Sequence, residues 1–205
     1  MKLTNRCNQL IYRLWAPIYD ATVNQFFMPG RKRALALLAL QPGERVLILG
    51  VGTGADLPLL PTGVEAVGID ISPEMLAKAR AKLTRTPASV TLIQGDAQVC
   101  LVPEGQFDAA ILNLILSVIP DGQACLRTAL AALKPGGRAV IFDKFLPDDA
   151  RPALSRKFIN LFSTLLGTDI NRRFSEISAG ADCILTHDEP SLMRGMYRVK
   201  LIEKR

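Results

Sequence analysis

The stretch from residue 46 to 57, "VLILGVGTGADL", constrains the fold of this chain more than any other feature. An apolar run of strand-forming residues breaks into three alternating glycines and then resumes as an expected helix. Glycine lets the backbone turn sharply and approach a ligand closely. The free N–H groups at a helix start favour an anionic ligand group. The stretch therefore predicts a strand, a loop and a helix at the edge of a binding site.

The segment from residue 46 to 145 alternates strand and helix candidates. Such alternation predicts an open parallel sheet with helices on both faces, whose ligands bind at the carboxyl ends of the strands. Two last strands with a short link should pair as an antiparallel hairpin on the sheet edge. The expected strands are 45–51, 64–71, 89–96, 107–116, 138–145, 183–190 and 195–205. The expected helices include 30–38, 73–83 and one within 123–137 that the Pro-Gly-Gly at 135–137 closes.

Length and composition suit one α/β domain of 205 residues. The N-terminus has no apolar core of a signal peptide, and no apolar stretch is long enough to span a bilayer. We therefore expect a cytoplasmic protein, or a peripheral one on the inner face of the membrane. The cysteines form no CxxC pair and His187 is the single histidine, which disfavours a metal site, a disulfide framework and a serine-hydrolase triad. The cysteines are Cys7, Cys100, Cys125 and Cys183.

Positive charge is concentrated in two segments outside the glycine-loop region. The formal net charge is +6; residues 1–33 hold six basic groups and one acid, and residues 144–173 hold six basic groups and three acids. Each segment also repeats apolar residues at helical spacing. This pattern is typical of a helix at an anionic membrane surface, but also of a covering helix packed on the domain. Both interpretations stay open, and they can coexist.

Two acidic residues stand at the carboxyl ends of predicted strands. Asp70 ends the second strand, where a carboxylate can accept both ribose hydroxyls of an adenosine. Asp96 ends the third strand, where it can accept from the exocyclic amine of an adenine while the N–H of Ala97 faces a ring nitrogen. The loop also matches a Gly-x-Gly-x-x-Ala dinucleotide fingerprint, so a nicotinamide cofactor is an alternative. The absence of Gly-Lys-Ser/Thr excludes a nucleotide-hydrolysing P-loop.

Five motifs in order resemble the class I S-adenosylmethionine-dependent methyltransferases, across residues 42–146 and on into the hairpin. They are "VLILGVGTG", "VGIDISPEMLAKAR", "QGDA", "FDAAILNLILSVIPD" and "LKPGGRAVIFD". The resemblance implies a Rossmann-like, mostly parallel seven-stranded sheet with an N-terminal amphipathic helix lid. It implies S-adenosylmethionine as cofactor, held along its methionine moiety by the loop, at its ribose by Asp70 and at its adenine by four residues, with Asn113 near the methionine and the acceptor. The residues of these subsites are Gly50, Val51, Gly52, Thr53, Gly54, Asp70, Ile71, Met75, Asp96, Ala97 and Asn113.

One position departs from the family pattern. The family usually carries Asp or Glu two residues before the first glycine, where it helps to hold the amino group of the cofactor, and this chain has Ile48. We expect Ile48→Glu to tighten cofactor binding if the missing carboxylate is a real loss. No change, or weaker binding, would mean that the site holds that amino group by other means.

Three shorter motifs lie outside that core: "LWAPIYD" before it, the expected helix "GRKRALALL", and "RRFSEISAG" at the entry into the last hairpin. In these motifs the chain most resembles bacterial phospholipid N-methyltransferases and the related quinone-biosynthesis C-methyltransferases. Both resemblances imply that the N-terminal helix closes over the cofactor with Tyr19 and Asp20. The first implies methyl transfer to an amine headgroup, with Tyr19 assisting at the acceptor. The arginine side chain suits phosphate oxygens, so Arg31, Arg172 and Arg173 would contact a lipid phosphate. Together with Tyr19 at the acceptor, they are the expected substrate contacts. The alternatives are a soluble enzyme for a quinone ring or another small metabolite, a cofactor-binding regulator and a nicotinamide oxidoreductase.

The predicted organisation is one methyltransferase domain over residues 1–205. Within it we expect an N-terminal lid or membrane-surface helix, a cofactor-binding core, a helical cap and the C-terminal hairpin. Their ranges are 1–33, 42–146, 147–175 and 176–205. A small molecule or a lipid is the expected partner, together with an anionic membrane surface. No added recognition domain and no base-amine motif point to nucleic acid.

Overall fold

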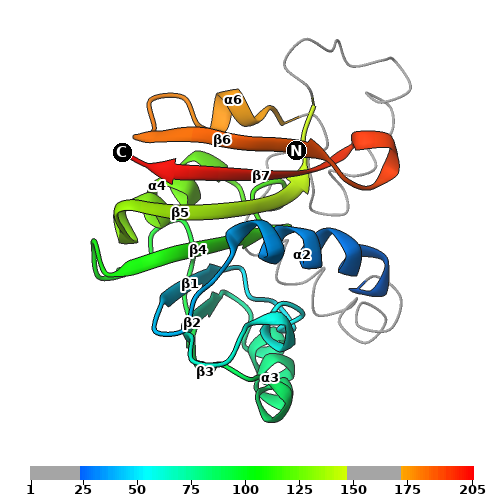
Figure 1. The fold of residues 1–205 in the computed structure, drawn as a ribbon, viewed down its shortest axis with the longest axis vertical. Coiled ribbons are helices and arrows are strands. Elements are labelled where there is room, and N and C mark those ends of the chain that lie inside the picture. Colours follow the sequence, from blue (N-terminus) through cyan, green and yellow to red (C-terminus); the bar gives the residue numbers. More distant parts are fainter. Residues whose placement is uncertain (1–23, 147–171) are drawn as a thin grey trace.

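The computed structural model describes residues 24–146 and 172–205, and a seven-stranded sheet runs through both ranges. The strand order is β3-β2-β1-β4-β5-β7-β6; β1 to β5 are parallel, and β7 runs antiparallel to both β5 and β6 (Figure 1). The predicted parallel sheet and edge hairpin are therefore confirmed. The strands are β1 Arg45–Leu49, β2 Glu65–Asp70, β3 Ser89–Gln94, β4 Phe107–Asn113, β5 Leu133–Lys144, β6 Cys183–Pro190 and β7 Tyr197–Lys204.

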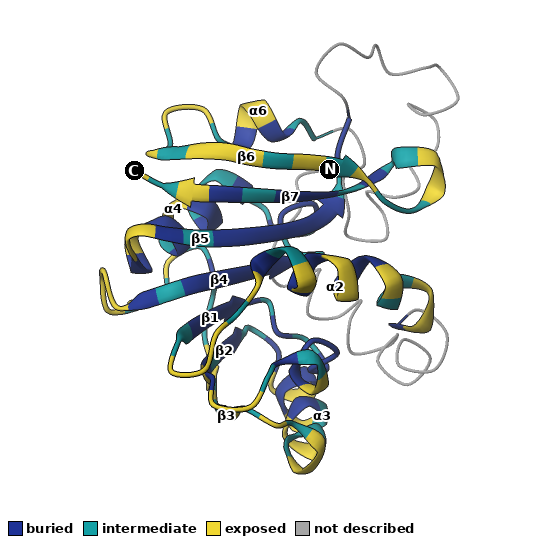
Figure 2. Cartoon of the chain, in the orientation of Figure 1, coloured by how far each residue is buried: buried dark blue, intermediate teal, exposed yellow. Residues whose placement is uncertain are grey.

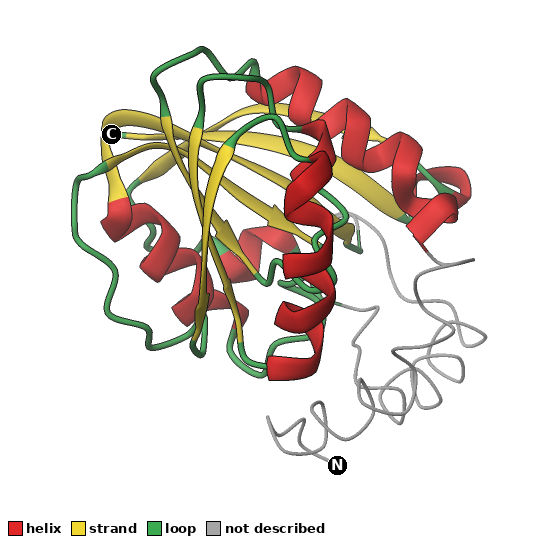
Figure 3. Cartoon of the chain, turned by 90° about the horizontal axis from the view of Figure 1, so that it is seen from below, coloured by secondary structure: helices red, strands yellow, loops and turns green. Residues whose placement is uncertain are grey.

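Helices cover both faces of this sheet (Figure 3). Side chains of α2 and α3 pack on one face in a core with alternate residues of β1 and β4, such as Ile48 and Ile111. Side chains of α4 and α6 pack on the other face, against the intervening residues of β1 and β4, such as Leu47 and Leu112. Central strands that are covered on both faces are expected to be mainly apolar, and Figure 2 shows that β4 and most of β5 are buried. The helices are α2 Asn24–Leu38, α3 Pro73–Lys82, α4 Gly122–Ala132 and α6 Phe174–Ile177, with 3-10 turns η2 Leu57–Leu59, η3 Leu83–Arg85 and η4 Met193–Gly195.

Helix α2 crosses the boundary predicted at residue 33. It begins at Asn24 and packs across β5, where the backbone of Gly30 lies so close to the Phe142 ring that an added Cβ would sit 2.2 Å from it. The segment 24–33 therefore belongs to a helix that covers the sheet. Residues 1–23, with Tyr19 and Asp20, and residues 147–171 lie outside the described residues. The lid and the cap stay predictions.

Two helix predictions are wrong: one α-helix is absent and another ends earlier than expected. The glycine loop leads into the 3-10 turn η2 and not into an α-helix, because Pro58 and Pro61 cannot donate backbone hydrogen bonds and β2 follows soon after. The helix expected to run up to the Pro-Gly-Gly at 135–137 ends earlier, at Ala132, and Leu133 is already extended and pairs with Phe107. The first correction removes the α-helix dipole that was expected to serve an anionic group at the loop.

Candidate functional site

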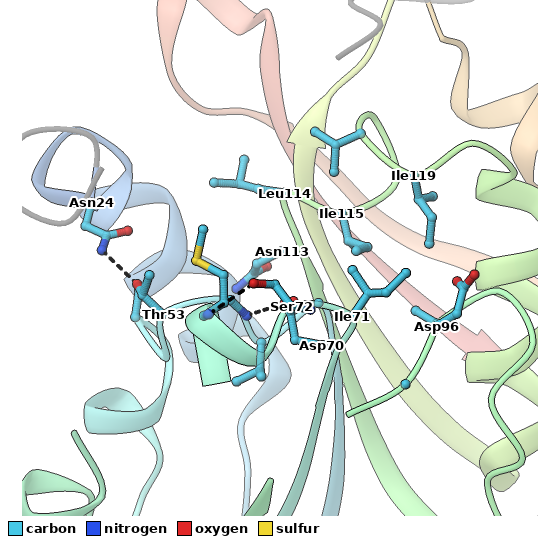
Figure 4. A pocket seen from close by; sticks show the side chains of 18 of the residues that line it. Asn24, Thr53, Asp70, Ile71, Ser72, Asp96, Asn113, Leu114, Ile115 and Ile119 are labelled. Carbon is cyan, nitrogen blue, oxygen red and sulfur yellow. Dashed lines mark hydrogen bonds between the residues drawn. The ribbon is translucent and has the colours of Figure 1, made fainter. Parts of the chain in front are cut away.

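A pocket opens at the carboxyl ends of β1, β2, β3 and β4 (Figure 4). It encloses about 880 Å³ with its open mouth included. Most of the predicted site residues line it, although Gly54 does not. The lining residues are Asn24, Arg31, Gly50, Val51, Gly52, Thr53, Ala55, Asp70, Ile71, Ser72, Met75, Gly95, Asp96, Ala97, Asn113, Leu114, Ile115, Val118 and Ile119.

The glycine loop forms one wall of the pocket. Gly52 has a φ of +54°, in the left-handed region that glycine adopts readily, and its N–H donates to the Asp70 carboxylate at 2.7 Å. At Gly50 an added Cβ would lie 2.4 Å from the Ile115 side chain. Gly54 instead packs against Leu57 and the backbone of α3, so its contribution is to close the turn.

Asp70 is fixed from two sides at the end of β2. Its two carboxylate oxygens accept from the backbone N–H of Gly52 at 2.7 Å and of Ser72 at 2.9 Å. Burial raises the pKa of Asp70, and these backbone donors oppose that rise. Each oxygen keeps further accepting capacity, so the carboxylate can take two hydroxyl donors from a ligand in the pocket.

Asp96 lies across the pocket from the glycine loop, beside the buried Ala97 (Figure 4). Its carboxylate accepts from the backbone N–H of Gln98 at 3.0 Å and from the Gln98 side-chain amide at 2.9 Å. Gln98 also accepts from the backbone N–H of Asp121 at 2.7 Å, which ties Asp96 to the start of α4. Gln98 is not among the predicted site residues, because no spacing rule marks a residue that acts by holding its neighbour.

Apolar side chains form the part of the pocket between Asp70 and Asp96. Ile71 comes from the end of β2, whereas Val118 and Ile119 come from the loop after β4. Met75 stands on α3, whose N-terminus is capped by the Ser72 hydroxyl accepting from the Met75 N–H at 3.2 Å. This slot suits a flat, weakly polar ring. Its loop residues are further site residues that were not predicted.

The loop after β4 is held in an unusual conformation. Leu114 has a φ of +60°, which costs a non-glycine residue free energy and is frequent at functional sites. The buried Asp143 carboxylate accepts from the Ser117 N–H at 2.9 Å, and burial raises the pKa of Asp143. Arg172 donates to the carbonyls of Leu116 and Pro120 at 2.6 and 3.1 Å. These bonds fix the loop whose side chains form the apolar slot.

The arginines predicted to contact a substrate therefore occupy different surroundings. Arg172 is used to hold the loop, and neither it nor Arg173 lines the pocket. The Arg173 Nε lies 3.7 Å from the Glu176 carboxylate. Arg31 lines the pocket but is buried, and its Nη1 pairs with Asp56 at 2.5 Å. Their contacts to lipid phosphate stay a prediction.

Asp56, behind the glycine loop, connects helix α2 to the end of β4. It is 2% exposed; one oxygen accepts from Arg31 of α2 and the other from the Asn113 side-chain amide at 3.0 Å. Nearby, the Thr53 hydroxyl accepts from Asn24 and from Lys82, each at 3.3 Å. Asp56 and Asn24 are not among the predicted residues. Asp56 could have been found from its position two residues after Gly54, the last glycine of the loop.

Residues 24–146 and 172–205 contain no group of three or more His, Cys, Asp or Glu side chains that could hold a metal ion. No helix in them is long and apolar enough to cross a membrane. His187 lies on β6, where its Nε2 is 2.8 Å from the Glu189 carboxylate, and it does not line the pocket.

Comparisons with known proteins agree with this geometry. Residues 46–137 match the family model described as a methyltransferase domain. The chain is 30% identical to a phosphatidylethanolamine N-methyltransferase of Cereibacter sphaeroides over 95% of its own length and 96% of that protein. It is 34% identical to a demethylmenaquinone methyltransferase of Thermus thermophilus, but over 62% of its own length and 61% of that protein.

Solved structures share the fold at low sequence identity. A chain from a complex of a methyltransferase with its activator in Haloferax volcanii superposes with a TM-score of 0.77 at 17% identity, covering 96% of both chains. A geranyl diphosphate C-methyltransferase of Streptomyces coelicolor, solved with S-adenosyl-L-homocysteine, gives a TM-score of 0.72 at 15% identity, covering 90% of this chain and 83% of that one.

Proposed function

This chain belongs to the class I S-adenosylmethionine-dependent methyltransferases, and from that premise we propose that it methylates the amine headgroup of a phospholipid at a membrane surface. The acceptor would be phosphatidylethanolamine or its methylated forms. The observation that carries the proposal is the likeness to a phosphatidylethanolamine N-methyltransferase over nearly the whole of both chains. The likeness to the quinone enzyme covers less than two thirds of either chain.

The pocket fits S-adenosylmethionine, which supplies an electrophilic methyl group on its sulfonium. The Asp70 carboxylate would accept from the ribose hydroxyls, and the apolar slot of Ile71, Val118 and Ile119 would take the adenine. Asp96 would accept from the adenine amine, and the loop from Gly50 would lie along the methionine moiety. The residues of this chain then act by holding the reactants in line and by excluding water.

The end of the molecule at which the pocket opens carries exposed apolar groups beside basic ones. Phe26 of α2 and Met193 of the β6–β7 turn are 49% and 55% exposed. Both segments lie at the carboxyl end of the parallel strands (Figure 1). Phe26 packs against Phe27, whose ring contacts Tyr197 next to that turn. Exposed apolar side chains with a basic neighbour such as Arg194 suit an anionic lipid surface.

The predicted contacts of Tyr19 with the acceptor belong to this proposal. An amine acceptor must be neutral to attack a methyl group. A tyrosine close to it would accept a hydrogen bond from the headgroup nitrogen while the released proton passes to water. Arg173 is the arginine proposed to contact the lipid phosphate. It lies outside the pocket, beside the Glu176 carboxylate. Arg172 contributes by keeping the loop after β4 in place.

Mass spectrometry of lipids tests the acceptor. The protein is incubated with methyl-labelled cofactor and vesicles that contain phosphatidylethanolamine and its monomethyl and dimethyl forms, mixed with an anionic lipid. We expect labelled methyl groups on the headgroup nitrogen. A parallel reaction offers a demethylated quinone and small amines without vesicles. Turnover there, with no labelled lipid, would replace the phospholipid by a soluble acceptor.

Removing the two exposed apolar side chains should weaken vesicle binding selectively. We expect the double variant Phe26→Ser, Met193→Ser to co-sediment with anionic vesicles about tenfold less strongly, because two apolar side chains no longer enter the interface. Its affinity for S-adenosylhomocysteine should stay unchanged. The matched control is Ile184→Ser, equally exposed at 49% but near the opposite end of the sheet. Equal vesicle binding by both variants and the wild type would remove this surface from the proposal.

A further inference from the structure

Two side chains that line the pocket each hold a buried polar atom without a hydrogen-bond partner among the described residues. These atoms are Nε of Arg31, a donor, and Oδ1 of Asn113, an acceptor. Arg31 is 8% exposed and Asn113 is 4% exposed, and both side chains line the pocket. Leaving a buried polar group unpaired costs free energy, so such atoms at a binding site indicate a ligand that pairs with them. That ligand must present an acceptor and a donor.

Asp56 fixes the positions of these two side chains. Its Oδ2 accepts from Nη1 of Arg31 at 2.5 Å, and its Oδ1 accepts from Nδ2 of Asn113 at 3.0 Å. Because Nδ2 donates to Asp56, the remaining polar atom of the Asn113 amide is its acceptor oxygen. Asp56 itself does not line the pocket. It is therefore a positioning residue behind two pocket residues.

The charges of this cluster match one end of the cofactor. Arg31 and Asp56 together are neutral, and an α-amino acid end carries one carboxylate and one ammonium group. The loop is followed by a 3-10 turn, so the guanidinium takes the place of an α-helix N-terminus as the source of positive charge. Ile48 leaves β1 without a carboxylate, and Asp56 supplies one a few residues later in the same loop region.

We propose that Arg31 and Asn113 bind the amino-acid end of the cofactor. Nε–H of Arg31 donates to the α-carboxylate, and Oδ1 of Asn113 accepts from the α-ammonium. Asp56 positions both and replaces the acid that position 48 lacks. This assignment takes Arg31 away from its predicted role at a lipid phosphate. It rests on the cofactor of the family and not on the phospholipid acceptor, so a failed lipid assay leaves it untouched.

Calorimetric binding without any acceptor tests the assignment. The ligands are S-adenosylhomocysteine, S-adenosyl-3-thiopropylamine, which lacks the carboxylate, and S-adenosyl-4-thiobutyrate, which lacks the amine. We expect the wild type to bind each truncated ligand at least about tenfold more weakly than S-adenosylhomocysteine, because each loses a charge-assisted hydrogen bond. The adenosine part, common to all three, reports the integrity of the rest of the pocket.

Two variants link each lost ligand group to its residue. Arg31→Lys keeps the charge opposite Asp56 but removes the second donor, and it should weaken S-adenosylhomocysteine about tenfold while leaving S-adenosyl-3-thiopropylamine within about twofold of the wild type. Asn113→Leu should also weaken S-adenosylhomocysteine about tenfold, while it leaves S-adenosyl-4-thiobutyrate within about twofold of the wild type. The matched control is Arg80→Lys, at an exposed position of α3 outside the pocket, which should bind all three ligands as the wild type does.

The pattern of losses decides the outcome. If Arg31→Lys weakens all three ligands equally, the arginine acts only through the shape of the pocket and the assignment is overturned. If the wild type binds the three ligands equally, the amino-acid end is not recognised by this cluster, which again overturns it. A selective loss toward the ligands that carry the carboxylate supports it, even if Asn113→Leu does not fold.

Discussion

Asp70→Asn is expected to raise the dissociation constant of S-adenosylhomocysteine about 100-fold, because two charge-assisted hydrogen bonds to the ribose hydroxyls are lost. The carboxylate also accepts from the N–H groups of Gly52 and Ser72, and an amide has a single acceptor atom for all four donors. The NH₂ group of the variant side chain is itself a donor, so it would face an N–H of the loop or a hydroxyl of the ribose without forming a hydrogen bond. Isothermal titration calorimetry of both proteins measures the effect.

The same residue should make cofactor binding sensitive to acid. Burial raises the pKa of Asp70, so the charged form is lost at a higher pH than for an ordinary aspartate. Affinity for S-adenosylhomocysteine should therefore be constant near neutral pH and fall as the pH drops through that raised pKa. The contribution of Asp70 to folding has the opposite sign: with a raised folded-state pKa, it is fully present below the unfolded pKa and is lost as the pH rises.

The Asn variant separates this titration from others in the same range. The adenine ring of the ligand also protonates in acid, but it does so equally for both proteins. We expect the ratio of the two dissociation constants to shrink toward 1 as the pH falls. A ratio that stays constant across the acid range, or a variant that binds as the wild type does at neutral pH, would mean that Asp70 only supports the loop.

The parallel sheet explains why much of this site is predictable from the sequence. Asp70 and Asp96 stand at the carboxyl ends of consecutive strands, and the carboxyl ends of parallel strands meet at one edge. The residues that were not predicted act through contacts between distant parts of the chain. Asp56 meets Arg31 and Asn113, which stand 25 and 57 positions away, and local patterns carry no information on such contacts.

The misplaced helix limits have a similar cause. Periodicity extends a helix up to the Pro-Gly-Gly at 135–137, but the pairing of Leu133 with Phe107 in the neighbouring strand ends it at Ala132. Basic residues with apolar neighbours indicate a surface helix, yet Arg31 is buried against the pocket because Asp56 neutralises it. Composition shows that a charge is present; only the fold shows which partner it meets.

Ile48→Glu is expected to destabilise the chain by about 4 kcal/mol, because it places a carboxylate in a dry core. Ile48 is 1% exposed in the core between the sheet and α2, and it does not line the pocket. Position 48 is therefore a poor site for restoring the family acid, contrary to the tighter cofactor binding expected from the sequence. Unfolding in urea at neutral pH measures the loss, and Ile48→Val should cost only about 1 kcal/mol.

Ile48→Gln separates the cost of charge from the cost of polarity at this position. A buried glutamate has a raised pKa, so its charge penalty shrinks as the pH falls through that pKa, whereas the glutamine variant carries no such term. The stabilities of the two variants should therefore converge in acid and diverge toward neutral pH. A glutamate variant that is as stable as Ile48→Gln at neutral pH and binds S-adenosylhomocysteine more tightly than the wild type would contradict this. It would show that the side chain reaches the pocket and that the missing carboxylate is a real loss, which would also remove the reason for Asp56 to replace it.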